Sequence, residues 1–241
     1  MRIIVEQWAP EYGSSTSDTM DETTATVDVE VEVPVEEWAP RTPPPGTHQP
    51  PELAFVDGVR RVEPGPASGD ALSLALQGCM ADLERVVSEA VPDDCLLVLD
   101  GPIRERTGLD HAVGYVKTHH VSYLPATIQE VVAQLQPGER TPVFLIGDGG
   151  FRRWSWYVRL PGDTSHAWAG VVRCELSPDR VADDVFAIAD TCALMLPRFG
   201  SEAHKDKRAP QNLYPIAGLE RELRRRLGDP ALLYRALRAA A

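Results

Sequence analysis

The stretch Cys95-Leu96-Leu97-Val98-Leu99-Asp100-Gly101 decides the fold class. Its first five residues are all apolar, as in a strand that is covered on both faces of a sheet. A second apolar run, Leu53-Ala54-Phe55-Val56-Asp57-Gly58, ends in the same Asp-Gly pair. Between the two runs, the residues from Ser68 or Asp70 to about Ala90 have the apolar spacing of a capped helix. This strand, helix, strand order predicts two parallel strands joined by a right-handed crossover.

Further elements follow downstream and complete the predicted architecture. The patterns predict helices over residues 126–135, 178–195, 216–227 and 230–239, and strands over residues 142–146, 154–160 and 167–176. The last two strands are predicted to form an antiparallel pair, because a Pro-Gly-Asp turn lies between them. The sequence therefore predicts an α/β protein with a mixed sheet flanked by helices.

The N-terminal part of the chain differs from the rest in composition. Residues 1–40 hold ten acidic residues and one arginine, a balance of −9 within the net charge of −12. Residues 2–8 and 25–35 have strand-like patterns, and residues 13–24 are typical of a loop, so residues 1–40 are predicted to form a small β-rich, hairpin-like acidic extension. Residues 41–51 contain five prolines and predict a linker. Residues 52–241 are then the main domain.

Composition also limits the class of protein. A chain of 241 residues can bury one sizeable core. The longest apolar runs are strand-sized, far below the roughly 20 residues of a membrane span, and the first residues are charged too early for a signal peptide. We therefore expect a cytoplasmic protein without a membrane partner. The four cysteines form no C-x-x-C pair, and the chain has no H-E-x-x-H, G-x-S-x-G or G-K-S/T motif, which disfavours zinc, serine-hydrolase and P-loop chemistry.

Two carboxylates are the first candidates for chemistry. Asp57 and Asp100 each follow a hydrophobic strand, at the edge where an open α/β sheet has its ligand crevice. If the strands are neighbours, the two side chains meet, and a hard divalent cation such as Mg²⁺ or Mn²⁺ relieves their repulsion. The alternative for each residue alone is an ordinary Asp-Gly turn.

Two further residues are weaker candidates. Glu84 shares a predicted helix face with Met80 and Val87, so its carboxylate is paired, metal-bound or at the rim of the core. Lys117 follows a turn and can contact a phosphate or neutralise charge in a transition state. The alternatives are a solvated glutamate and an ordinary surface lysine.

Five short motifs, taken in order, resemble the NurA nuclease domain over about residues 50–228. They are Phe55-Val56-Asp57-Gly58, the Met80-x-x-x-Glu84 helix, Leu97-Val98-Leu99-Asp100-Gly101-Pro102, Gly114-x-Val116-Lys117, and Asp206-Lys207-Arg208-Ala209-Pro210-Gln211-Asn212-Leu213. Each motif is short, and the resemblance rests on their order and spacing together.

The resemblance implies an RNase H-like fold and Mn²⁺-dependent (or Mg²⁺-dependent) cleavage of DNA in end processing during double-strand break repair. The implied partners are DNA, a HerA-like hexameric ATPase and a second copy of the chain in a homodimer. Asp57, Asp100 and Glu84 match metal ligands that would hold two ions, and Lys117 matches a catalytic lysine. Arg208 and the helix with Arg221, Arg224 and Arg225 would then contact DNA, although a basic helix can equally be a solvated face.

One departure from the family pattern bears on activity. The family often has an Ala-His pair after the late proline motif, whereas this chain has no histidine after His204. Either His204, Asn212 or Tyr214 substitutes, or the site is one ligand short. Two alternatives therefore stay open: a non-catalytic NurA-like adaptor that binds DNA or a helicase, and an actin-like or sugar-kinase-like ATPase.

Overall fold

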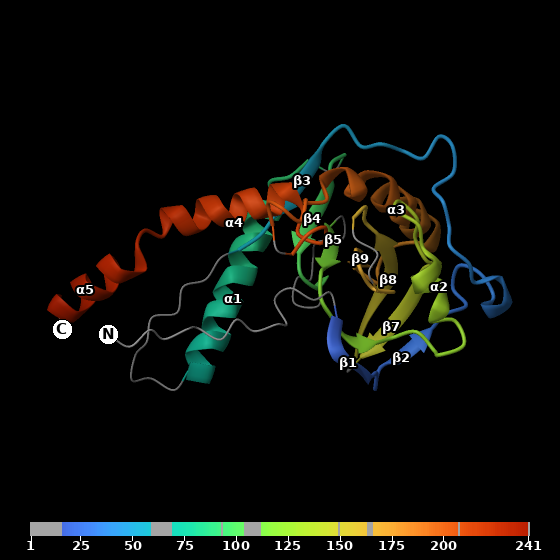
Figure 1. The fold of residues 1–241 in the computed structure, drawn as a ribbon, viewed down its shortest axis with the longest axis horizontal. Helices are drawn as coiled ribbons and strands as arrows, with labels where there is room; N and C mark the ends of the chain where they lie inside the picture. The colour runs from blue at the N-terminus through green and yellow to red at the C-terminus, as the bar shows by residue number, and fades with distance from the viewer. Residues whose placement is uncertain are drawn as a thin grey trace.

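A mixed β-sheet is the centre of the computed structural model, which describes residues 16–58, 69–92, 94–103, 112–148, 150–162, 166–206 and 208–240 (Figure 1). Within these residues the sheet has seven strands in the order β2-β7-β8-β9-β5-β4-β3. Their bounds, in that order, are Thr26–Asp28, Phe144–Asp148, Phe151–Arg159, Val171–Leu176, Ala112–Val116, Leu96–Asp100 and Leu53–Val56. The predicted α/β class, with a mixed sheet and flanking helices, is confirmed.

The parallel part of the sheet is the part that the sequence predicts most directly. Strands β3 and β4 pair in parallel, with Val56 opposite Leu99, and helix α1 (Gly69–Ser88) lies between them in the chain. Strand β5 adds to β4, also in parallel. The predicted parallel pairing of two strands with a helix between them is therefore confirmed.

The other strands run antiparallel to their neighbours. Strand β9 pairs with β5 and β8, β8 with β7, and β7 with the short strand β2. The predicted antiparallel pair is confirmed as β8 and β9. Strands β5 and β6 (His119–Ser122) were not predicted from the sequence; β6 pairs in parallel with β1 (Thr16–Glu22) in a separate two-stranded sheet.

Two hydrophobic cores cover the two faces of the sheet. Helix α3 (Ala182–Met195) packs on the face that carries Val98, Tyr115 and Trp156, all of which are fully buried. The opposite face, with Tyr157, is covered by helix α2 (Glu130–Gln134) and by Trp38 from the N-terminal part of the chain. A third, smaller cluster around Leu97 and Leu99 lies on that opposite face at the β3–β4 end.

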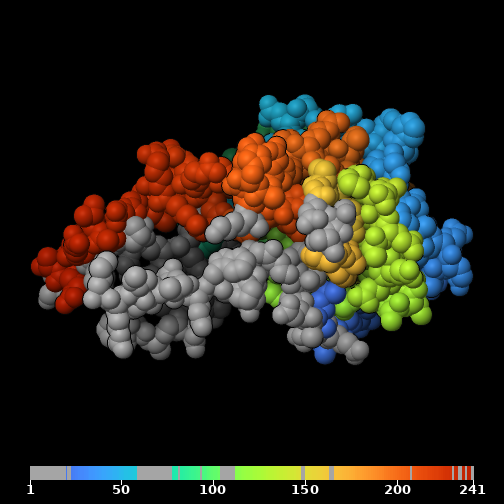
Figure 2. Space-filling model, viewed as in Figure 1, coloured from blue at the N-terminus to red at the C-terminus, as the bar shows by residue number. Residues whose placement is uncertain are grey.

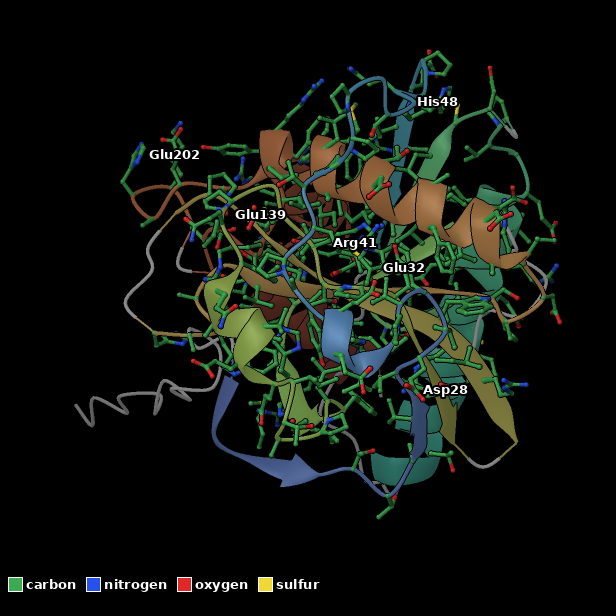
Figure 3. The ribbon with its side chains drawn as sticks, turned by 90° about the vertical axis from the view of Figure 1, so that its right-hand side faces the viewer. Asp28, Glu32, Arg41, His48, Glu139 and Glu202 are labelled. Atoms are coloured by element: carbon green, nitrogen blue, oxygen red, sulfur yellow. The ribbon has the colours of Figure 1, made fainter. Side chains whose placement is uncertain are left out.

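The N-terminal segment lies against the main sheet. The strand predicted over residues 25–35 is limited to β2 at the sheet edge, and the loop predicted over residues 13–24 contains β1, so both predictions need correction. After β2, Glu32 forms ion pairs with the guanidinium of Arg140, at 2.9 Å, and with Arg41, at 3.2 Å; Glu32 and Arg41 are labelled in Figure 3. Residues 2–8, the other half of the predicted hairpin, lie outside the described residues.

The proline-rich residues 41–51 run from this ion pair along the sheet toward β3. Arg41 forms an isolated bridge with Arg140, and the carbonyl of His48 accepts a hydrogen bond from Thr191 on α3 at 3.1 Å. Figure 3 shows this segment passing in front of α3 between the labelled Arg41 and His48. The segment is therefore attached to the sheet at one end and to α3 at the other.

The C-terminal helices extend from the β3–β4 end of the sheet. Helix α4 (Tyr214–Arg226) begins beside the strands, and α5 (Pro230–Ala240) continues away from the body, as the red projection in Figure 2 shows. Helix α1 lies at the same end of the sheet (Figure 1). Among the helices that the structure describes, none has both the length and the apolar character of a membrane span.

Candidate functional site at the β3–β4 edge

The ends of β3 and β4 bring Asp57 and Asp100 together. Because Val56 is opposite Leu99 in the parallel ladder, Asp57 follows its strand directly beside Asp100. Phe55 and Val98, two residues earlier on each strand, pack in the same core. Side chains two residues apart lie on the same face of a strand, so both carboxylates are on the α3 and α4 side of the sheet.

The electrostatic environment of Asp57 reflects this proximity. The pKa of Asp57 is raised from 3.8 to about 6, chiefly by burial and then by the nearby carboxylate of Asp100, with a smaller contribution from Glu220. Lys117 and a hydrogen bond from the backbone of Gly58 act in the opposite direction. Burial and a neighbouring carboxylate both disfavour the charged form of a carboxyl group, and strongly shifted pKa values of this kind are common at functional sites.

Lys117 supplies part of that positive charge. Its ammonium group donates to Asp100 Oδ2 at 2.6 Å and to Asn212 Oδ1 at 3.3 Å. Asn212 is fully buried and donates through Nδ2 to Asp206 Oδ2 at 2.5 Å. The hydroxyl of Tyr115 donates to the carbonyl of Gln211 at 2.6 Å, which attaches this late segment to β5.

Glu84 reaches the same edge from helix α1. Its side chain is 6% exposed, and a Cβ built at Gly58 would lie 2.9 Å from Glu84 Oε1 and 2.8 Å from Met80 Cε. The carboxylate of Glu84 therefore lies against the Asp57-Gly58 segment. Asp57, Glu84, Asp100 and Lys117, predicted from separate motifs, thus lie around one edge of the sheet.

The predicted DNA-contacting arginines lie on or next to α4. Arg208 is ion-paired with Glu220 at 2.7 Å, and Arg224 reaches the other oxygen of the same carboxylate at 2.6 Å. Arg225 pairs with Glu222 at 2.8 Å. Arg221, Arg224 and Arg225 are exposed on the helix, whereas Arg208 is partly buried beside the site.

The three residues considered as histidine substitutes have different positions. Asn212 contacts Lys117 within the site, as described above. His204 is exposed, and its Nδ1 lies 3.2 Å from Glu202. Tyr214 is 38% exposed and contacts Lys205 at 3.3 Å. Of the three, Asn212 is thus the residue that the structure places in a hydrogen bond with Lys117.

Two acids of the site were missed as candidates from the sequence. Asp206 contacts Asn212, and Glu220 contributes to the raised pKa of Asp57. Both come from segments more than a hundred residues after β4, so spacing along the chain does not reveal them. In the described ranges, no three His, Cys, Asp or Glu side chains converge closely enough to form a group that could hold a metal ion.

Comparison with known proteins gives no further constraint on this site. No family model matches the chain, and no curated protein matches it.

Proposed function

We propose that this chain is a metal-dependent DNA nuclease of the RNase H-like, NurA-like class. The observation that carries the proposal is the adjacency of Asp57 and Asp100 at the carboxyl ends of two paired parallel strands, with the Glu84 carboxylate against the same turn. Strand-end carboxylates of this kind lie where open α/β sheets bind their ligands. The proposal includes action in the cytoplasm on DNA ends, as a homodimer with a HerA-like ATPase.

The donor atoms are of the kind that a hard divalent cation prefers, but in the described residues the carboxylates would have to move closer together to hold one. Carboxylate oxygens are the ligands that Mg²⁺ and Mn²⁺ prefer, and a cation beside Asp57 would favour the charged form of a carboxyl group whose pKa burial and Asp100 raise to about 6. Asp57, Asp100 and Glu84 would hold the ions. Two bound ions supply an activated water and stabilise the leaving oxygen of a phosphodiester.

The remaining residues of the site would act on the substrate backbone. Lys117 is 2.6 Å from Asp100, and a cation beside Asp100 would release this ammonium to contact a DNA phosphate. Asn212 would limit how far Lys117 moves, because its amide holds both Lys117 and Asp206. The exposed arginines of α4 would guide the strand through phosphate contacts, which carry no base specificity.

A second candidate is the non-catalytic adaptor. It is favoured by the Lys117–Asp100 ion pair, because an ammonium group already occupies the position next to a carboxylate that a metal ion would take. The departure from the family pattern after Pro210 points the same way. In this case the site would be a structural ion-pair network, and DNA or a helicase would bind elsewhere.

Metal-dependent stability separates the two candidates. At a Mn²⁺ concentration about 100 times its Kd, binding to the native state adds about 2.7 kcal/mol, which for a chain of this size raises Tm by about 5–10 °C. We expect this rise in the wild type and in Asp179→Ala, an exposed control, and no rise in Asp57→Ala or Asp100→Ala. An unchanged wild-type Tm in Mn²⁺ would favour the adaptor.

A further inference from the structure

A buried glutamate lies on the face of the sheet opposite to Asp57 and Asp100. Glu175 in β9 is fully buried, and its Oε1 accepts hydrogen bonds from Arg153 Nε at 2.9 Å and from Arg173 Nε and Nη2 at 3.0 and 2.8 Å. The guanidinium of Arg173 also lies 4.6 Å from the ring centre of Tyr123, whose hydroxyl accepts from Arg153 at 3.2 Å. With these contacts the carboxylate has a fixed orientation.

The second oxygen of Glu175 holds the chain that leaves β4. Oε2 accepts a hydrogen bond from the backbone N–H of Ile103 at 3.1 Å. The chain turns back directly after Asp100, because Gly101 has φ 99° and its N–H donates to the carbonyl of Tyr115 at 2.8 Å. Ile103 thereby comes to lie on the opposite face, among the buried residues next to Leu99.

Gly114 lets the returning chain come this close. A Cβ at Gly114 would lie 2.9 Å from the backbone nitrogen of Ile103 and 3.1 Å from the carbonyl oxygen of Gly101. Glu175 is paired with Gly114 in the β5–β9 ladder, so its side chain extends from the strand beside β5, directly opposite Gly114. The side chain of Glu175 therefore holds the turn after Asp100 from the opposite face of the sheet. The absence of a side chain at Gly114 leaves the space that this turn needs.

We infer that Glu175 is a positioning residue for Asp100, which it holds through the hydrogen bond to Ile103. This inference rests on the proposed function, because it assigns Glu175 a role in the same metal site. Glu175 touches neither the substrate nor the ions. Two arginines keep its carboxylate from turning away from Ile103, and the short turn transmits this constraint to Asp100 three residues earlier. Residues that orient metal ligands in this way typically affect metal affinity or activity by 10–100-fold.

The test compares Glu175→Gln with Glu32→Gln. Glu32 is a matched control, since its side chain is 5% exposed, binds the guanidinium of Arg140 and accepts a backbone N–H from Val143 at 2.6 Å, in another part of the fold. The double variant Arg153→Met/Glu175→Gln keeps the net charge of the cluster. It replaces Glu175→Gln in the test if that single variant does not fold. Each variant is measured for Mn²⁺ affinity by calorimetry, DNA cleavage, and amide hydrogen exchange of Ile103 relative to Val98.

We expect Glu175→Gln and the double variant to lose roughly 10–100-fold in Mn²⁺ affinity or cleavage and to speed exchange at Ile103 relative to Val98. Glu32→Gln should lower Tm without these changes. Equal effects of Glu175→Gln and Glu32→Gln on Mn²⁺ affinity and cleavage would overturn the inference, as would unchanged relative exchange at Ile103. If the wild type neither binds Mn²⁺ nor cuts DNA, the metal-site role fails with the proposed function, and the exchange measurement alone shows whether Glu175 holds the turn.

Discussion

The ammonium group of Lys117 lies 2.6 Å from the carboxylate of Asp100, so the residue proposed to meet phosphate is also the counter-ion of a proposed metal ligand. Both side chains are mostly buried, at 18% and 17% exposure. Lys117 therefore stabilises the site without metal, and under the proposed function it would have to share or leave Asp100 when a metal ion binds.

Replacing Lys117 should affect stability and activity together. Lys117→Met leaves Asp100 without its ion pair, so we expect a loss of about 1–3 kcal/mol in the free energy of unfolding at pH 7. Cleavage should fall by about 10²–10³ if the ammonium stabilises transition-state charge. Urea unfolding and initial cleavage rates check both numbers. The control is Lys205→Met, an exposed lysine next to Tyr214; an equal loss of cleavage in this control would contradict the role of Lys117.

Asp57 should make the protein less stable as pH rises. Its pKa in the folded state, about 6, is above the ordinary value of 3.8, so the folded protein binds this proton more tightly than the unfolded chain does. The stabilising effect is complete below about pH 4 and is lost as pH rises through 6. Asp57→Asn should remove this loss. At pH 7.5 in metal-free buffer we expect its free energy of unfolding to exceed that of the wild type by about 1–2 kcal/mol, a value that is reduced because the side chain is partly exposed.

Urea unfolding of the wild type and Asp57→Asn at pH 4 and pH 7.5, both in EDTA, measures this effect. The difference between the two proteins should favour the variant only at the higher pH. A variant that is destabilised equally at both pH values would show that Asp57 has no unfavourable charge in the folded state.

Gly114 should tolerate no side chain. Gly114→Ala would force apart the backbone of Ile103, which a Cβ would approach to 2.9 Å. Because backbone atoms cannot rotate away as the end of a side chain does, we expect destabilisation of about 1–3 kcal/mol together with loss of Mn²⁺ binding. Gly218→Ala in α4 is the control, since nothing lies within 4 Å of its added Cβ. It should be neutral or stabilise by about 0.5–1 kcal/mol; a milder effect at Gly114 than at Gly218 would refute the proposed close packing.

Arg140 should be important for stability and not for cleavage. It is 1% exposed and binds both Glu32 and Asp190, at 2.9 and 2.7 Å. Arg140→Met removes the ion pair to Asp190 and leaves Glu32 with Arg41 alone; breaking a buried pair in this way typically costs about 3–5 kcal/mol. Thermal unfolding should show this loss, while residual folded protein cuts DNA at the wild-type rate. Arg198→Met, at an exposed arginine, should change neither.

The sequence predicts the parallel part of the sheet well, because the signals for its strands and helix lie within short, continuous stretches of the chain. Each Asp-Gly pair ends an apolar run, and the helix between the runs allows one crossover geometry. The adjacency of Asp57 and Asp100 follows from this pattern alone. Strand β5 was missed because it contains Gly114, a poor strand former. The position requires glycine because Ile103 packs against it.

The rest of the site depends on contacts between distant segments. Asn212 reaches Lys117 from a segment far downstream and is itself bonded to Asp206. Glu220 acts on Asp57 from α4. Glu32 is one of ten acids in the first forty residues, and nothing in its neighbourhood distinguishes it as the partner of Arg140. Ion pairs of this kind are set by tertiary packing, for which the sequence pattern has no periodic signal.

The most direct measurement is cleavage of end-labelled single- and double-stranded DNA by the purified protein in Mn²⁺, Mg²⁺ and EDTA. Asp57→Ala, Asp100→Ala and the exposed control Asp179→Ala are tested beside the wild type. The account predicts metal-dependent cutting that both site variants lose and the control keeps. Cutting that survives in both site variants would contradict it, as would no cutting by the wild type even with a HerA-like ATPase and ATP present.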